Sequence, residues 1–284
     1  MMVLRIAYKF TSRLGIFTLA ILLASMLTLT YAFNWQASAK PMLGIFYCYY
    51  YDDTLTITTE LERMKADGFQ IICIPYVWWS DDPQSPWRVQ TDVLYTKAAQ
   101  LGLKVYVREP DPATLEKYLN AYASKISYFQ VINEADARLL KEWAVPGELT
   151  STAWKNAETI KKFNPNIKTV ASFSTPLFPD LIQSIAQHVD IIALDIYEQI
   201  QLNTFPVQMQ TMLTLSGKHT IWIGEFGYAT LDDQQQADFI LKGLNMFKTN
   251  GIEAVIIWTW NTNTGLAIKG RQAETTIRKW AEEA

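Results

Sequence analysis

From residue 42 onward, the sequence alternates eight times between short apolar segments and longer amphipathic ones. The short segments are rich in β-branched and aromatic residues, whereas the longer ones have the spacing of helices. This alternation predicts βα units around a parallel sheet. The predicted strands are MLGIFYCY (42–49), FQIICIPYVW (69–78), LKVYVRE (103–109), ISYFQVINE (126–134), KTVASFS (168–174), DIIALDIYE (190–198), HTIWIGEFG (219–227) and IEAVIIWTW (252–260).

Eight units in about 245 residues predict an α/β fold, a minimal (β/α)8 TIM barrel with few insertions. A doubly wound open sheet is the competing architecture. We expect several helices to end at a glycine, the usual residue after a helix and before a strand. These glycines are Gly68, Gly102, Gly217 and Gly251.

The composition suits one large globular domain, predicted for residues 40–284. Of the 284 residues, 49% are apolar and 19% charged, which is too hydrophobic for a disordered chain. The basic residues Arg5, Lys9 and Arg13 precede the domain, so the domain itself has 22 basic and 28 acidic side chains. A net charge of −6 gives no attraction for phosphate backbones or anionic lipid, which argues against nucleic-acid binding.

Residues 1–39 have the features of an export segment, either a cleaved signal peptide or a membrane anchor. Leu14–Phe33 contains no charge over 20 residues, which is long enough to span a bilayer. The sequence Ala37–Ala39 fits the small-residue pattern of a cleavage site, so the two alternatives stay open. The preceding cations predict that residues 40 onward lie outside the cytoplasm, secreted or tethered to the membrane.

Few residues are available for cysteine, histidine or metal chemistry. Cys48 and Cys73 are too few and too far apart for a zinc site, and we expect both in the core. His188 and His219 precede predicted strands, and there is no G-x-S-x-G, P-loop or G-x-G-x-x-G motif. We therefore expect no metal, no cofactor and no Ser-His or Cys-His nucleophile.

Two predicted strands end in glutamate. The fourth ends in Asn133-Glu134, and the seventh ends in Glu225-Phe226-Gly227. The glutamates are 91 residues apart, about three βα units, so their strands face each other across the barrel mouth. Active sites of such barrels lie at the carboxyl ends of the strands. Glycosidic cleavage needs two carboxyl groups, one as acid and one ionised beneath the sugar.

These strand-end motifs resemble clan A glycoside hydrolases, and the resemblance extends over roughly residues 41–284. It implies that Glu134 is the acid/base, that Glu225 is the nucleophile and that Asn133 binds the sugar 2-hydroxyl. It further implies cleavage with retention, with the two carboxyl groups about 5–5.5 Å apart. Two glutamates on solvated loops are the alternative interpretation.

The resemblance assigns roles to other strand ends. Tyr197 matches the aromatic hydroxyl that contacts the nucleophile, and either Trp258 or Trp260 matches the tryptophan under the scissile sugar. Trp260 lies nearer the strand end. Arg108 could pair with Glu225 and lower its pKa, although relatives often supply this arginine from the second strand. An ion pair between Arg108 and its neighbour Glu109 is the alternative.

Aromatic residues crowd the predicted strand ends and the loops that follow them. Flat rings on a solvated rim stack against sugar faces, so we expect Tyr47, Tyr49, Trp78 and Trp79 to contact substrate. Further residues of this kind are Tyr50, Tyr51, Trp87 and Trp143. Ordinary loop packing is the competing explanation for each ring taken alone.

The segment DIIALDIYE (190–198) is similar to the acidic strand of chitinase-type barrels, but its spacing differs. Asp195 and Glu198 are three residues apart, so on a strand they point to opposite faces. Asp195 shares a face with Tyr197, where it could contact substrate or support the residues that do.

The sequence therefore predicts an extracytoplasmic retaining glycoside hydrolase acting on β-linked glycans, with an endo mode favoured by short loops. Its partners would be a poly- or oligosaccharide and, through residues 14–33 alone, a membrane; no protein partner is indicated. The alternatives are a wall-remodelling transglycosidase with the same site, and a non-catalytic, membrane-tethered carbohydrate-binding barrel. A barrel enzyme that binds phosphorylated substrates through Asn261–Gly265 is a third. Glucan, mannan, galactan and xylan all remain open as substrates.

Overall fold

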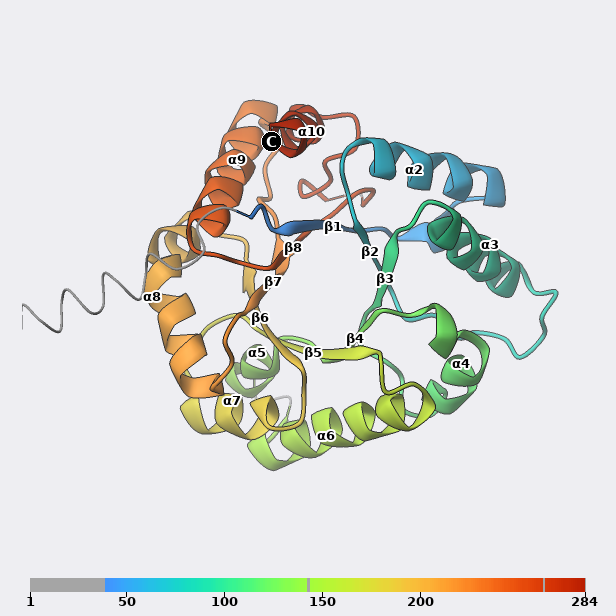
Figure 1. Ribbon diagram of the computed structural model, residues 1–284, viewed down its shortest axis with the longest axis horizontal. Coiled ribbons are helices and arrows are strands. Elements are labelled where there is room, and N and C mark those ends of the chain that lie inside the picture. The colour runs from blue at the N-terminus through green and yellow to red at the C-terminus, as the bar shows by residue number, and fades with distance from the viewer. Residues whose placement is uncertain (1–38, 142–143, 263, 284) are drawn as a thin grey trace, which may run out of the picture. The chain divides into compact units, whose positions relative to one another are not determined.

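The computed structural model of the protein describes residues 39–141, 144–262 and 264–283. Eight parallel strands close into a barrel in sequence order, with β8 paired to β1 (Figure 1). The predicted barrel is confirmed, and the open-sheet alternative is wrong. The strands are β1 (Met42–Phe46), β2 (Ile71–Ile74), β3 (Lys104–Val107), β4 (Tyr128–Ile132), β5 (Lys168–Phe173), β6 (Ile191–Ile196), β7 (Trp222–Phe226) and β8 (Ala254–Ile257).

Each strand lies inside the segment predicted for it but ends earlier. In β8 the ladder stops at Ile257, whereas the apolar run continues to Trp260. Side chains beyond the last ladder residue are no longer bound to alternate between the two faces of the sheet. Hydrophobicity alone does not mark this boundary, because the loops that line the mouth are aromatic as well.

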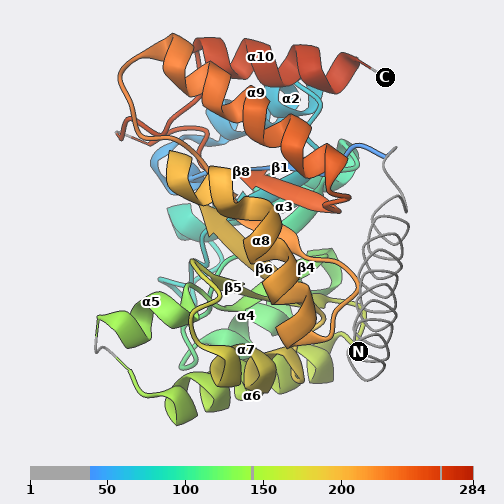
Figure 2. The same ribbon diagram turned by 90° about the vertical axis from the view of Figure 1, so that its left-hand side faces the viewer.

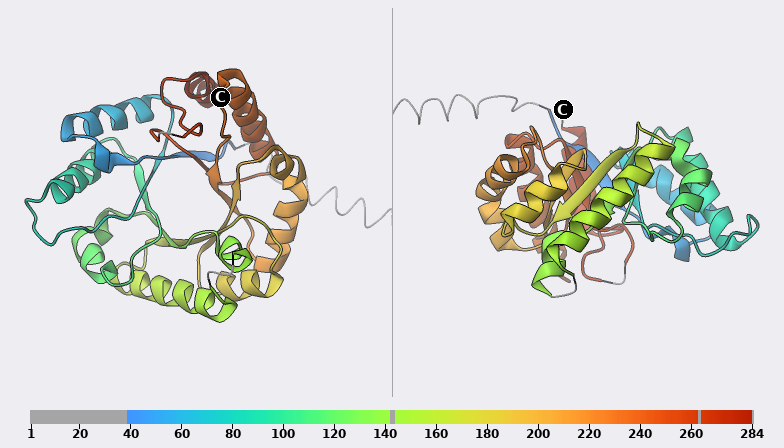
Figure 3. Two further views of the ribbon diagram at one scale, coloured as in Figure 1. Left: turned by 180° about the vertical axis from the view of Figure 1, so that it is seen from behind. Right: turned by 90° about the horizontal axis from the view of Figure 1, so that it is seen from below.

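The helices form an outer ring around the strands, as the view from the side and the view from behind both show (Figures 2 and 3). All four predicted glycine caps have positive φ, between 65° and 91°. The α-helices are α2 (Thr54–Ala66), α3 (Pro86–Gln100), α4 (Leu115–Tyr122), α5 (Ala135–Leu140), α6 (Pro146–Phe163), α7 (Pro179–Ala186), α8 (Gln199–Ser216), α9 (Asp233–Thr249) and α10 (Gln272–Glu282), with 3-10 turns η1 (Tyr49–Tyr51) and η2 (Ala123–Lys125).

The strands separate two hydrophobic clusters. The larger cluster fills the space between the barrel wall and the helices. The smaller one fills the barrel interior and includes Phe46, Tyr106, Trp222 and Ile256. Gly44 makes room in this interior, since a Cβ there would lie 2.4 Å from the Ile256 side chain. The interior is a packed core, so chemistry is confined to its carboxyl-terminal mouth.

The predicted export segment lies outside the described residues. None of the helices in the ranges that the structure does describe is long and apolar enough to cross a bilayer. From Lys40 onward the chain forms one compact unit, which contains all of the strands above.

Candidate active site

Three of the predicted site residues meet at the ends of β3, β6 and β7. Glu225 is the fourth residue of β7, and its side chain is buried. Arg108, directly after β3, forms an ion pair with Glu225 Oε1. Tyr197, directly after β6, donates its hydroxyl hydrogen to Glu225 Oε2. The alternative pair with Glu109 is not formed, because Glu109 pairs instead with Arg138.

Burial and these two partners act in opposite directions on Glu225. Burial raises the pKa of Glu225 above its ordinary value, while the Arg108 charge and the Tyr197 hydrogen bond oppose that rise. The charge of Glu134 raises the pKa further. For Arg108, burial lowers the pKa, but Glu225 together with the smaller effects of Cys73, Tyr106 and Asp195 outweighs burial, and the net pKa is raised. The guanidinium therefore stays charged, and Glu225 depends on it to ionise inside a nearly dry site.

Glu134 occupies the turn between β4 and α5 in an unusual backbone conformation. Its φ of 43° and ψ of 53° are left-handed, and it is the only non-glycine residue with positive φ in the described ranges. Such a conformation costs about 1–2 kcal/mol for an L-residue. The Ser174 hydroxyl donates to Glu134 Oε1 at 3.1 Å, and the Glu134 N–H donates to Ser172 at 3.1 Å. Strain held in place by hydrogen bonds is a sign of a functional position.

Asn133 is fixed by neighbours on β4 and β5. Its Oδ1 accepts hydrogen bonds from Gln130 Nε2 at 2.9 Å and from the Ser172 hydroxyl at 3.2 Å. With its oxygen occupied in this way, Asn133 keeps its amide N–H groups for a ligand. A ligand hydroxyl could accept from them, and the contact of Asn133 with a sugar stays a prediction.

A belt of polar side chains crosses the mouth on five consecutive strands. Arg108 Nε donates to Gln130 Oε1 at 3.2 Å, and Gln130 Nε2 donates to Ser172 at 3.1 Å. Asp195 on β6 follows Ser172 and pairs in the strand register with Glu225. The Asp195 side chain is buried beside Glu225, which agrees better with a supporting position than with an open contact surface. Burial and the charge of Glu225 raise the pKa of Asp195 far above its usual value.

Sequence reasoning missed Gln130, Ser172 and Ser174 of this site. The signal was present for the first two, because each is a polar residue between two apolar ones near the end of its strand. A polar side chain inside a barrel needs a partner, so its position one or two residues before the strand end marks the belt.

Trp258 is the tryptophan that reaches the mouth. Its ring stacks on Phe46 with a centroid distance of 4.0 Å, and the Arg108 guanidinium lies 4.3 Å from its centroid. The ring is only partly buried and packs on the interior cluster. Trp258 and Trp260 are the two predicted candidates for the tryptophan under the scissile sugar. Of the two, Trp258 lies beside Arg108, the ion-pair partner of Glu225.

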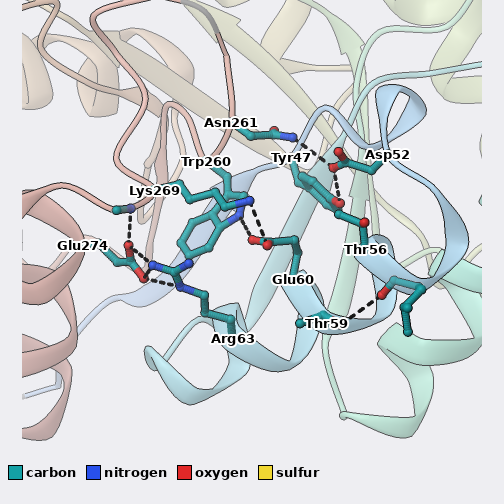
Figure 4. Close-up of polar contacts among 12 residues, drawn as sticks. Tyr47, Asp52, Thr56, Thr59, Glu60, Arg63, Trp260, Asn261, Lys269 and Glu274 are labelled. Atoms are coloured by element: carbon teal, nitrogen blue, oxygen red, sulfur yellow. Dashed lines mark hydrogen bonds and ion pairs between the residues drawn. The ribbon is translucent and has the colours of Figure 1, made fainter.

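Three residues predicted to bind substrate are fully buried elsewhere. Trp260 points away from the mouth and donates its indole N–H to Glu60 of α2 at 2.6 Å (Figure 4). Tyr47 donates its hydroxyl to Asp52 at 2.6 Å, and the Tyr49 hydroxyl meets Thr91 of α3 at 2.8 Å. Each residue faces the helices rather than the barrel axis. Their predicted contact with substrate is therefore corrected to a packing role.

The predicted rim residues Trp78 and Trp79 differ in their exposure and contacts. Trp78 donates to Asp81 at 2.8 Å and lies under the Arg88 guanidinium, 4.3 Å from its ring centroid. Trp79 is 55% exposed. Trp143 lies outside the described residues. Only Trp79 of this group presents an open aromatic surface.

Cys48 and Cys73 are free and buried, as predicted. His188 and His219 are exposed and precede β6 and β7, at the amino-terminal ends of the strands. In the part of the chain that the structure describes, no group of three or more His, Cys, Asp or Glu side chains could hold a metal ion.

Comparison with known proteins connects this geometry to one class of folds. No protein-family model matches the chain, and neither does any curated protein sequence. Solved structures do match. An endo-1,4-β-mannanase from Rhizomucor miehei superposes with a TM-score of 0.67 at 11% identity, over 86% of this chain and 96% of the mannanase.

Two further matches are β-glycosidases. The β-glycosidase BGL167 matches with a TM-score of 0.63 at 11% identity, over 82% of this chain and 87% of the other. A β-galactosidase from the psychrophilic Marinomonas ef1 gives 0.65 at 11% identity, over 85% of this chain but only 59% of the larger enzyme. The chain thus has the barrel fold of clan A glycoside hydrolases, as the strand-end motifs predict.

Proposed function

We propose that the protein is a retaining glycoside hydrolase that cleaves β-linked glycans. The observation that carries the proposal is the setting of Glu225, buried between a fixed cation and a hydroxyl donor at the mouth of the barrel. A glutamate on a solvated loop would need neither of these partners. Glu134, in the strained turn that follows β4, supplies the second carboxyl group.

In the first step, ionised Glu225 attacks the anomeric carbon while protonated Glu134 donates its proton to the glycosidic oxygen. The bond to the leaving sugar breaks, and a glycosyl ester forms on Glu225. Arg108 and Tyr197 keep Glu225 ionised and oriented before the attack. Asn133 would bind the 2-hydroxyl, where hydrogen bonding strengthens as the oxocarbenium-like transition state develops.

In the second step, Glu134 is ionised and takes a proton from water. The resulting hydroxyl attacks the anomeric carbon from the face that the leaving group vacated, and the ester bond to Glu225 breaks. Both carboxyl groups return to their starting states, so the configuration is retained. No redox or metal step enters this sequence.

The fold neighbours support the proposed substrate class. They are described as a β-mannanase, a β-galactosidase and a β-glycosidase, whose substrates all carry β-linkages. The short loops of a barrel with few insertions favour an open groove and endo cleavage.

The test is release of reducing ends by the full chain from a panel of β-linked polysaccharides. Glu225→Ala removes the nucleophile, and we expect kcat/KM to fall by about 10⁴-fold or more. Glu253→Ala is the matched control, because Glu253 is an exposed glutamate at the amino-terminal end of β8. It should keep wild-type activity.

Three outcomes would change the proposal. Equal activity in the Glu225→Ala variant would remove Glu225 from its role. Transfer of sugar to an oligosaccharide acceptor, without reducing ends, would indicate the transglycosidase. Binding of a glycan with no release in any variant would leave the non-catalytic barrel.

We also propose that the barrel acts outside the cytoplasm, held or exported by residues 1–39. The charge-free run 14–33 behind three cations supports this. Protease added to intact cells should digest the barrel, whereas a barrel protected until the cells are lysed would contradict the proposed location.

A further inference from the structure

Four aromatic residues gather on η1 after β1, on the loop after β2 and at the start of α3. Tyr50 contacts Tyr51, Trp79 and Trp87 at centroid distances of 4.4, 5.2 and 6.3 Å, and Trp79 meets Trp87 at 4.4 Å. We call Tyr50, Tyr51, Trp79 and Trp87 the aromatic platform. Tyr51 is 78% exposed and Trp79 is 55% exposed, so the platform offers open rings although its members support one another.

The platform is continuous with the candidate active site. Tyr50 and Trp258 both pack on the interior cluster of the barrel, which includes Phe46 and Cys48. Phe46 in turn stacks on Trp258 beside Arg108. Trp258 and the platform therefore pack on the same interior cluster, next to the end of β1.

The opposite rim differs in kind. The exposed apolar residues in the loops after β5 and β7, and at the start of α8 after β6, are Leu177, Leu231 and Ile200. Aliphatic side chains lack the flat face that stacks on a sugar ring. A glycan that extends beyond the site would thus find stacking partners on the β1–β2 side.

The acidic residues around the platform favour a neutral glycan over an acidic one. Asp52 and Asp53 flank the platform after η1, and Asp81 and Asp82 follow Trp79 directly. Lys117 pairs with Asp81, and Arg88 lies over Trp78. A chain of uronic acids would meet a surplus of negative charge here. A neutral glycan would not be repelled.

The positions of the two glutamates give the direction of binding. Glu134 lies on the β4 side and would protonate the leaving oxygen, so the leaving sugar extends from that side. The attacked sugar lies over Trp258, next to β1. The remainder of the chain, on its non-reducing side, therefore continues from Trp258 toward Tyr50.

We propose that the aromatic platform binds the non-reducing portion of a neutral β-linked oligosaccharide, beyond the sugar that Glu225 attacks. The proposal rests on the proposed function for its direction. The platform would hold the chain by stacking on Trp79 and Tyr51, which makes a polymer a better substrate than a single glycoside.

Aryl β-glycosides with one to four neutral sugar units test this, because the aryl group occupies the leaving position and every sugar extends the other way. In the full-length wild type, kcat/KM should rise with the number of sugar units. Trp79→Ala and Tyr51→Ala should each reduce that rise by about two- to tenfold, the effect expected for the loss of one aromatic contact. The aryl monosaccharide should react equally fast in all three proteins.

Two further variants make the experiment decisive. Trp79→Phe keeps a ring and should restore most of the gain, whereas Leu177→Ala, on the opposite rim, should change nothing. Equal losses on short and long substrates would overturn the proposal, as would a preference for uronic-acid chains. Absence of hydrolysis in every protein would reject the proposed function. The platform is then tested by titrating wild type and the Trp79→Ala variant with the oligosaccharide. Equal affinities of the two proteins would reject the platform as a binding site.

Discussion

Two clusters of buried acidic side chains are built in opposite ways. The first joins the beginning of the barrel to its end, and we call Glu60, Arg63, Trp260, Lys269 and Glu274 the seam cluster (Figure 4). Glu60 accepts from Trp260 at 2.6 Å and pairs with Lys269 at 2.8 Å. Both oxygens of Glu274 accept from Arg63 at 2.6 Å.

The second cluster lies at the mouth and consists of Arg108, Asp195, Tyr197 and Glu225. Here Arg108 is the single cation facing two carboxyl groups within the described residues. Neither Asp195 oxygen has a hydrogen-bond partner among these residues, although the Ser172 hydroxyl lies close by. The pKa values of both Asp195 and Glu225 are raised, chiefly by burial.

This difference between the two clusters distinguishes a structural role from a catalytic one. In the seam cluster the carboxylates of Glu60 and Glu274 are each matched by donors, as expected where charge serves to join elements. At the mouth one arginine serves two buried carboxyl groups, which costs stability and leaves a reactive carboxylate available to substrate. Substitutions in the seam cluster should therefore change stability, and substitutions at the mouth should change activity.

The largest contrast is expected between two arginines. Arg108→Met should lower kcat/KM by about 10²–10³-fold, as the loss of one fixed electrostatic partner does in other enzymes. It should also move the acid limb of the kcat/KM profile to higher pH. Without the Arg108 charge the pKa of Glu225 rises further, so a higher pH is needed to ionise it.

Arg63→Met is the matched change in the seam cluster. Losing one partner of a buried pair costs about 3–5 kcal/mol. Because the Arg63 side chain is 41% exposed, we expect about 2–3 kcal/mol of unfolding free energy with kcat/KM unchanged. Urea titration gives the unfolding free energy of the Arg108→Met and Arg63→Met variants, and steady-state kinetics give their kcat/KM. An inactive but stable Arg63→Met variant would break the distinction between the clusters.

The two tryptophans of the β8 loop give the next contrast. Trp258→Ala should lower kcat/KM by about 10²-fold, because the sugar loses its floor and its alignment with Glu225. Trp260→Phe should leave kcat/KM near wild type and reduce the unfolding free energy by about 1.5–3 kcal/mol, since Glu60 loses a donor. If Trp260→Phe impaired catalysis and Trp258→Ala did not, the assignment of the sugar floor would be reversed.

Most of the fold was predictable because each βα unit carries its own signal. Hydrophobic period, glycine caps and segment length repeat eight times, so errors at single boundaries do not alter the topology. The strand ends were the weak point. Trp260 and Tyr47 continue the apolar pattern of their strands, yet both follow the last ladder residue and point toward the helices.

The candidate site was partly predictable for a related reason. Glu134, Glu225 and Tyr197 carry chemistry that is conspicuous at a strand end. Ser172 and Gln130 act through hydrogen bonds to neighbours on other strands, which only the barrel register brings together. The left-handed backbone at Glu134 has no sequence signal either, because glutamate is not a residue that favours it.

The smallest effect, and the one that sharpens the comparison most, is expected at Asp195. Because its folded pKa is raised far above the unfolded value of about 3.9, the folded chain keeps this proton when the unfolded chain has lost it. Stability is thus lost as pH rises above about 4. Asp195→Asn removes that dependence, so the variant should gain stability relative to wild type between pH 4 and pH 7.

Asp190→Asn provides the control with the opposite sign. Burial raises the pKa of Asp190, but its bonds to Lys161 and Thr169 outweigh this, and the net pKa is lowered. Its contribution is present above pH 4 and is lost in acid, so Asp190→Asn should cost most at pH 7. Thermal melts across pH 4–7 compare the two variants. A pH-independent Asp195→Asn difference would mean that Asp195 is ionised in the fold, and that the mouth holds two negative charges against one arginine.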